Sequence, residues 1–156
     1  MRLSTALITA MVATSLAAVP AKAQQLGTYS VPANKIFLAG ISSGGYMAVQ
    51  MHVAFSHTFK GAAVYAGGPY YCAQDSLETA LTTCLDDVPP VPLSTLESTT
   101  AQWSAQRLID PVSNLKGQPV YMWSGKADTT VVQPVMELSR WIASCAMDRC
   151  WRFARA

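Results

Sequence analysis

The sequence has 156 residues, which is enough for one modest domain. It carries 11 basic and 9 acidic residues, and removing Arg2 and Lys22 with the first 23 residues leaves equal numbers of the two. A neutral balance provides no basic patch, so nucleic acid and anionic membrane are excluded as partners.

Residues 1–23 have the pattern of a secretory signal peptide. Arg2 gives a positive start, an apolar run follows, and AKA before Gln24 has the small-x-small form of a cleavage site. The run is too short and wrongly flanked for a membrane span, although a retained anchor is the alternative. We therefore expect a secreted protein, extracellular or periplasmic, without membrane contact after cleavage. Its domain would span residues 24–143, with an atypical tail at 144–156.

Beyond the signal peptide, strand-like and helix-like patterns alternate along the chain. Short apolar runs predict three buried strands, at residues 35–40, 60–68 and 118–125. Helical spacing of apolar residues predicts three helices, at residues 44–55, 94–109 and 132–143. Pro134 falls in the first turn of the last helix, where its missing N–H is harmless. Residues 69–92 are polar and stopped by prolines, which predicts a loop with at most short helical turns.

This alternation is typical of the α/β class, with a parallel sheet and helices on its faces. In such sheets the loops at the carboxyl ends of the strands carry the chemistry. Two loops meet that condition here, the turn after Gly40 and the turn after Gly125.

Four cysteines follow the signal peptide: Cys72, Cys84, Cys145 and Cys150. Export permits disulfides, and a bridge between Cys72 and Cys84 would close the polar loop between them, while the last two cysteines are a second candidate pair. A zinc site is disfavoured, because no Cys-x-x-Cys pair occurs and no histidine lies at ligand spacing from the cysteines.

The segment Gly40–Gly44 has the pattern G-x-S-x-G and lies between a predicted strand and a predicted helix. A serine at so sharp a turn has a crowded backbone, so we expect both flanking glycines to be required sterically. Ser42 would be the nucleophile, and the N–H of Ser43 at the helix start would stabilise an oxyanion. Ser43 is excluded as nucleophile because residue 41 is isoleucine, and no Gly-Lys-Ser/Thr marks a phosphate loop. A turn that merely packs helix against strand is the alternative.

Asp128 follows the third predicted strand, which puts it on the same rim of the sheet as Ser42. The order of serine before acid matches α/β-hydrolases and favours a triad role, whereas the alternative is an N-cap of the next helix. The base is missing from this pattern, because the only histidines, His52 and His57, precede Asp128. His52 would lie about 15 Å along the helix axis from Ser42, so we expect both histidines to be structural.

Two segments resemble the secreted poly(3-hydroxybutyrate) depolymerases, esterases of the α/β-hydrolase superfamily. They are Gly40–Gln74, with the serine turn and the run AGGPYYCA, and Leu108–Val131, with the predicted acid. The resemblance implies a partial α/β-hydrolase three-layer sandwich with a mainly parallel sheet, in a family that is often circularly permuted. It implies these roles: Ser42 as nucleophile, Asp128 as triad acid, Ser43 as oxyanion donor, and a disulfide between Cys72 and Cys84.

The resemblance also implies hydrolysis of polyester bonds without a cofactor. Trp103, Trp123 and the pair Tyr70–Tyr71 are candidate polymer contacts, although aromatic residues at such spacing are more often part of a core, and we expect only the two tyrosines to be exposed. After Trp141 the sequence has neither a histidine nor other features of the family, which we interpret as a truncation or a frameshift. Two alternatives stay open: a catalytically inactive fragment, and a feruloyl or acetyl-xylan esterase. Parallel strands without neighbours further predict a marginally stable or aggregation-prone chain.

Overall fold

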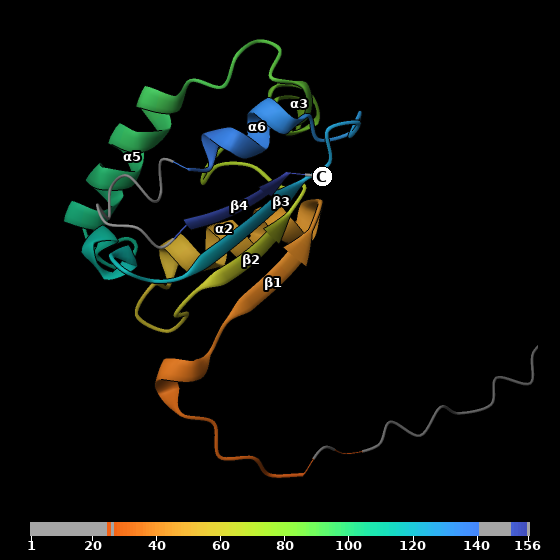
Figure 1. Ribbon diagram of the computed structural model, residues 1–156. Helices are drawn as coiled ribbons and strands as arrows, with labels where there is room; N and C mark the ends of the chain where they lie inside the picture. The colour runs from red at the N-terminus through yellow and green to blue at the C-terminus, as the bar shows by residue number, and fades with distance from the viewer. Residues whose placement is uncertain (1–24, 26, 141–150, 156) are drawn as a thin grey trace, which may run out of the picture. The chain divides into compact units, whose positions relative to one another are not determined.

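The computed structural model describes residues 25, 27–140 and 151–155 (Figure 1). The predicted signal peptide lies outside the described residues, as do Cys145, Cys150 and most of the predicted tail. The chain divides into two units, Met1–Ser30 and Val31–Ala156, and all helices and strands of the described residues belong to the second. None of those helices has the length and apolar character that a bilayer crossing requires.

A parallel sheet is the centre of the second unit (Figure 1). Its strands follow one another in the order of the sequence: β1 (Leu38–Ile41), β2 (Ala62–Tyr65), β3 (Val120–Ser124) and β4 (Trp151–Arg155). The three predicted strands and their parallel arrangement are confirmed, each a few residues shorter than predicted. β4 was not predicted, and it lies within the predicted tail.

The helices alternate with the first three strands as predicted. They are α2 (Ser43–Ala54), α3 (Leu77–Leu81), α4 (Thr83–Asp86), α5 (Leu93–Ala105) and α6 (Gln133–Leu138), with 3-10 turns η1 (Ala33–Lys35) and η2 (Val112–Leu115). The short helices α3 and α4 fall in the segment predicted as a loop with short helical turns. Pro134 lies in the first turn of α6, as predicted.

The main core lies between one face of the sheet and the helices α2 and α6. Because strand side chains alternate between faces, Val64 of β2 and Met122 of β3 point into this core. Val49 and Val53 of α2 and Met136 of α6 meet them there. This packing removes apolar surface from water and fixes α2, and with it the turn that precedes it, against the sheet.

The opposite face of the sheet carries aromatic side chains. Tyr65 of β2 lies with its ring centroid 5.7 Å from that of Tyr121 and 6.4 Å from that of Trp123, both on β3. The burial of β3 alternates, with Tyr121 exposed and Trp123 half-buried between buried neighbours. The face is therefore apolar yet open to solvent in the described structure.

A second, smaller core lies between the segment 69–92 and α5. A disulfide joins Cys72 to Cys84, and both cysteines pack with Val91 and with Leu96 of α5. Exported proteins use such disulfides to stabilise loops that bury little apolar surface. The disulfide therefore closes the loop that carries α3, and the packing on Leu96 holds this loop against α5.

Candidate active site

Ser42 occupies a sharp corner between β1 and α2. Its backbone has φ 54° and ψ −124°, a region that side-chain-bearing residues rarely adopt. The corner is held by two hydrogen bonds: the Ser42 N–H donates to the Tyr65 carbonyl at 2.9 Å, and the Tyr46 N–H donates to the Ser42 carbonyl at 3.0 Å. Strain of this kind is concentrated at functional sites and is retained when the surrounding structure enforces it.

The glycines around this corner have different steric roles. A Cβ on Gly40 would lie 2.0 Å from the Gly44 carbonyl oxygen, so Gly40 is required. A Cβ on Gly44 would meet nothing within 4 Å, whereas one on Gly45 would lie 2.8 Å from the Tyr65 oxygen. The expectation that both flanking glycines are sterically required is thus wrong for Gly44. The close approach of α2 to β2 needs the next residue, Gly45, instead.

Ser42 opens onto a cavity of about 630 Å³. One side of this cavity is formed by α2, through Ser42, Ser43, Tyr46 and Gln50. The other side comes from the disulfide-closed loop and its helix α3, and Thr130 of the loop after β3 completes the rim. The described structure therefore gives the Ser42 hydroxyl a roomy, partly apolar space in which a substrate would fit.

Asp128 lies in the loop after β3, two residues before Thr130. Its Oδ1 accepts hydrogen bonds from the N–H groups of Thr130 at 2.9 Å and Val131 at 3.0 Å. It is not the N-cap of α6, because that position belongs to Val132, which makes no side-chain cap. Asp128 therefore fixes its own loop through one oxygen, and no described residue donates to Oδ2.

Ser42 and Asp128 follow strands that have one strand, β2, between them. Two strand spacings amount to about 10 Å, which leaves room for an imidazole between a hydroxyl and a carboxylate. Ser43 is the first residue of α2, where a backbone N–H has no partner within the helix. The structure thus places all three residues predicted for the site at the carboxyl edge of one sheet.

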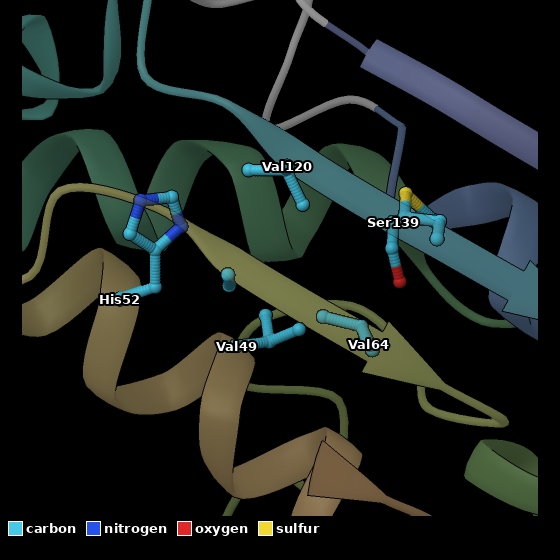
Figure 2. Close-up of a pocket in the computed structure, with 7 residues that line it drawn as sticks. Val49, His52, Val64, Val120 and Ser139 are labelled. Atoms are coloured by element: carbon cyan, nitrogen blue, oxygen red, sulfur yellow. The ribbon is translucent and has the colours of Figure 1, made fainter. Parts of the chain in front are cut away.

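Neither histidine lines the cavity in front of Ser42. His52 is buried on α2 and lines a small cavity of about 10 Å³, and Figure 2 shows it on the opposite side of this cavity from Ser139, with Val49 and Val64 between them. Its Nε2 lies 2.7 Å from the Gln118 Oε1, which accepts the imidazole N–H. Burial lowers the pKa of the imidazole, and this hydrogen bond to Gln118 opposes the shift in part. His57 is exposed, and its backbone N–H donates to the Asp110 carboxylate at 2.8 Å.

Tyr46 connects α2 to the disulfide loop and was not among the residues predicted from the sequence. Its hydroxyl donates to the carbonyl of Cys84, and its ring lies so close to Gly68 that a Cβ there would be 2.4 Å from it. Burial raises the pKa of this phenol well above its usual value, so the hydroxyl keeps its proton. The position four residues after Ser42, on the same helix face, was the available signal.

Of the two loop tyrosines predicted to contact polymer, only Tyr71 lines the cavity. Tyr70 is buried in the main core with its ring centroid 6.3 Å from that of Trp103, and the Tyr71 ring lies 4.5 Å from the same indole. The aromatic cluster is thus mainly structural, and it fixes the wall of the cavity against α5.

Comparison with known proteins identifies the family of this chain. Over 104 residues the chain is 51% identical to a poly(3-hydroxybutyrate) depolymerase of Delftia acidovorans, and over 123 residues 39% identical to a polyhydroxybutyrate depolymerase of Talaromyces funiculosus. The chain belongs to the poly(3-hydroxybutyrate) depolymerase family. The matched stretches cover 66% and 78% of this chain but only 21% and 35% of those depolymerases. No family model matches the sequence.

Solved structures of depolymerases share this fold. The PHB depolymerase from Penicillium funiculosum superimposes with a TM-score of 0.73 at 34% identity, over 85% of this chain and 41% of that one. A PHB depolymerase variant complexed with an R3HB trimer gives a TM-score of 0.71 at 32% identity. The chain thus spans less than half the length of the depolymerases that it matches.

Proposed function

We propose that this chain is a serine-type carboxylic ester hydrolase acting on poly(3-hydroxybutyrate) or its oligomers. The observation that carries the proposal is the strained corner at Ser42, which opens onto a cavity of about 630 Å³. The depolymerase relatives and the related complex with an R3HB trimer support the choice of substrate.

In this proposal the Ser42 hydroxyl attacks the ester carbonyl and forms an acyl-enzyme. The Ser43 N–H stabilises the oxyanion of the tetrahedral intermediate, and water later releases the 3-hydroxyacid. A histidine oriented by Asp128 takes the serine proton and then gives it to the leaving alcohol. Because His52 and His57 do not line the cavity, the proposed base is a histidine that this sequence does not supply. No cofactor is needed for these steps.

Esterase assays on the wild-type chain and the Ser42→Ala variant test this proposal. We expect a fluorophosphonate probe to label only the wild type, and p-nitrophenyl butyrate to be hydrolysed only by it. Free imidazole should raise the wild-type rate above the background measured with Ser42→Ala, because it substitutes for the absent base. Equal rates for the two proteins at every imidazole concentration would contradict the proposed nucleophile.

A second candidate function is ester binding without turnover. The sequence has two histidines, and neither is placed to serve Ser42. Oligomer binding by a chain that is neither labelled nor rescued by imidazole would favour this alternative. A feruloyl or acetyl-xylan esterase would instead hydrolyse methyl ferulate or acetylated xylan faster than a 3-hydroxybutyrate trimer.

Secretion is part of the same proposal. The support is the charge, apolar run and cleavage triplet of residues 1–23. Amino-terminal sequencing of the exported protein should begin at Gln24. Recovery of the protein with Met1 in the membrane fraction would favour a retained anchor.

A further inference from the structure

The cavity in front of Ser42 has an apolar wall that contributes to no core. Leu77 and Leu81 of α3 line the cavity with 75% and 58% of their surfaces exposed, and Ala80 lies beside them. α3 has no buried residue, so these leucines do not stabilise the described fold by burial. Contiguous exposed apolar side chains at the rim of a cavity are typical of a surface that binds a ligand.

The wall opposite these leucines is polar and comes from α2. Tyr46 and Gln50 lie four residues apart on α2, which puts them on one helix face about 6 Å apart along the axis, and Ser42 directly precedes the helix. The Gln50 Oε1 accepts the backbone N–H of Tyr71 at 3.1 Å. This bond orients the amide of Gln50, and the Nε2 of that amide donates to no described residue. Gln50 therefore offers two N–H donors on the cavity side of α2.

The two walls are held at a fixed spacing. The Cys72–Cys84 disulfide closes the loop that carries α3. One end of that loop is bound to α2 through Tyr71 and Gln50, and the other through Cys84 and the Tyr46 hydroxyl. Groups that are positioned before the ligand arrives lose less conformational entropy when it binds.

We propose that Gln50, Leu77 and Leu81 form a specificity subsite for one unit of a poly(3-hydroxyalkanoate) chain, which rests on the function proposed above. The Gln50 amide donates to the ester carbonyl, and the two leucines contact the alkyl group of the same unit. Each such unit has acceptor oxygens and a short alkyl branch but no donor, which matches one donating and one apolar wall. A carbohydrate ester would bury hydroxyl groups against leucine without partners, which disfavours its binding.

Trimer binding, measured by calorimetry on the full chain with Ser42→Ala to prevent turnover, tests the subsite. Replacing Leu77 and Leu81 by alanine should weaken binding of the 3-hydroxybutyrate trimer at least tenfold. The same variant should bind a 3-hydroxyhexanoate trimer more tightly relative to the 3-hydroxybutyrate trimer. Removing the two leucine side chains leaves room for the longer alkyl branch. Gln50→Glu keeps the acceptor for the Tyr71 N–H but loses the donor, and should weaken both trimers at least tenfold. Leu108→Ala, also exposed at 67% but outside the cavity, is the matched control and should change nothing.

The outcomes separate the subsite from the proposed hydrolysis. Trimer binding that depends on these residues supports the subsite even if the wild-type chain hydrolyses no ester. Absence of trimer binding, or affinities that match the Leu108→Ala control in all variants, overturns it even if Ser42 hydrolyses p-nitrophenyl butyrate. The leucine variants should keep the wild-type melting temperature because both side chains are exposed, so they decide the question if Gln50→Glu unfolds.

Discussion

The corner at Ser42 exists because two neighbouring backbone positions lack side chains. Gly40 lets the first turn of α2 fold back over the end of β1, and Gly45 lets the helix pass close to the carbonyl of Tyr65. Gly44 stands in open space although it belongs to the G-x-S-x-G pattern. The pattern alone therefore does not tell which glycine the fold needs.

Alanine substitutions at these glycines should have opposite effects. Gly40→Ala puts a methyl group 2.0 Å from a backbone oxygen, and we expect the free energy of unfolding to fall by at least about 2 kcal/mol. Gly44→Ala should leave it unchanged or raise it by about 0.5–1 kcal/mol, because alanine restricts the unfolded chain and favours helix. Urea denaturation of both variants measures the difference. Equal destabilisation would show that the corner packs differently.

His52 is a buried neutral base whose position links stability to pH. Its pKa is lowered in the folded state by burial, so the unfolded chain binds a proton more readily than the folded one. The free energy of unfolding should therefore fall as the pH drops below about 6.5, the ordinary pKa of histidine, toward the lower folded value.

Replacing His52 should make the free energy of unfolding depend less on pH. We expect His52→Gln to lose less free energy of unfolding between pH 7.5 and pH 5 than the wild type, whatever its stability at pH 7.5. His57→Gln replaces an exposed histidine and serves as the matched control for the substitution. Urea titrations at the two pH values give the slopes. Parallel slopes for all three proteins would contradict the role assigned to His52.

Sequence patterns predicted the Ser42 corner and Asp128 because a strand–turn–helix boundary fixes where such residues point. They did not predict Tyr46, Gln50 or the leucines of α3. Those side chains reach the cavity only because a disulfide and three-dimensional packing bring residues 71–85 over α2. Contacts between segments far apart in the chain leave no local periodicity to read.

At the scale of elements, the loop from Cys72 to Cys84 depends on its covalent closure. The bridge spans a sequence separation of 12, and closing a loop of that size stabilises the fold by about 3 kcal/mol in the loop-entropy model. The helix α3 inside the loop has five residues and is too short to be stable alone. The loop should therefore lose its order when the bridge is absent.

Reduction is the corresponding experiment. A reducing phosphine should lower the free energy of unfolding of the wild type by about 3 kcal/mol. A variant with Cys72→Ala and Cys84→Ala should have the lower free energy of unfolding before any reductant is added. A further decrease when the reductant is added to this variant would come from the remaining cysteines. A wild type that is indifferent to the reductant would show that the bridge adds nothing to stability.

Strands with continuous apolar runs were predictable, and their bounds shifted by one to three residues. Gly61 and Pro119 directly precede the hydrogen-bonded parts of β2 and β3. β4 was not predictable, because its segment WRFARA has two arginines and no long apolar run. It is placed by its parallel pairing with β3, from Val120↔Trp151 to Ser124↔Arg155. Pairing partners, unlike apolar runs, are a property of the assembled sheet.

At the scale of the whole described fold, one face of the sheet is packed and the other is open. Phe37 before β1 and Tyr121 of β3 are exposed by 55% and 36%, and both line an apolar cavity of about 310 Å³ near the amino ends of the strands. β1 is also an edge strand with unpaired backbone groups. These features favour association between copies of the chain.

Charge placed on this open region should reduce self-association. We expect the wild-type sedimentation coefficient to rise with concentration, and a variant with Phe37→Lys and Tyr121→Lys to stay closer to the monomer value. Leu108→Lys introduces a charge at a residue exposed by 67% outside that cavity, and should behave as the wild type. Monomeric sedimentation of the wild type at all concentrations would contradict this expectation.

The sheet order repeats the chain order, which has a consequence for assembly. As the chain is synthesised from its amino end, each new strand can pair with the strand that precedes it in the sequence. No strand that has already paired must be displaced to insert a later one. The corner that carries the Ser42 hydroxyl can therefore form once β1 and β2 have paired. The loop that carries Asp128 follows when β3 joins the sheet.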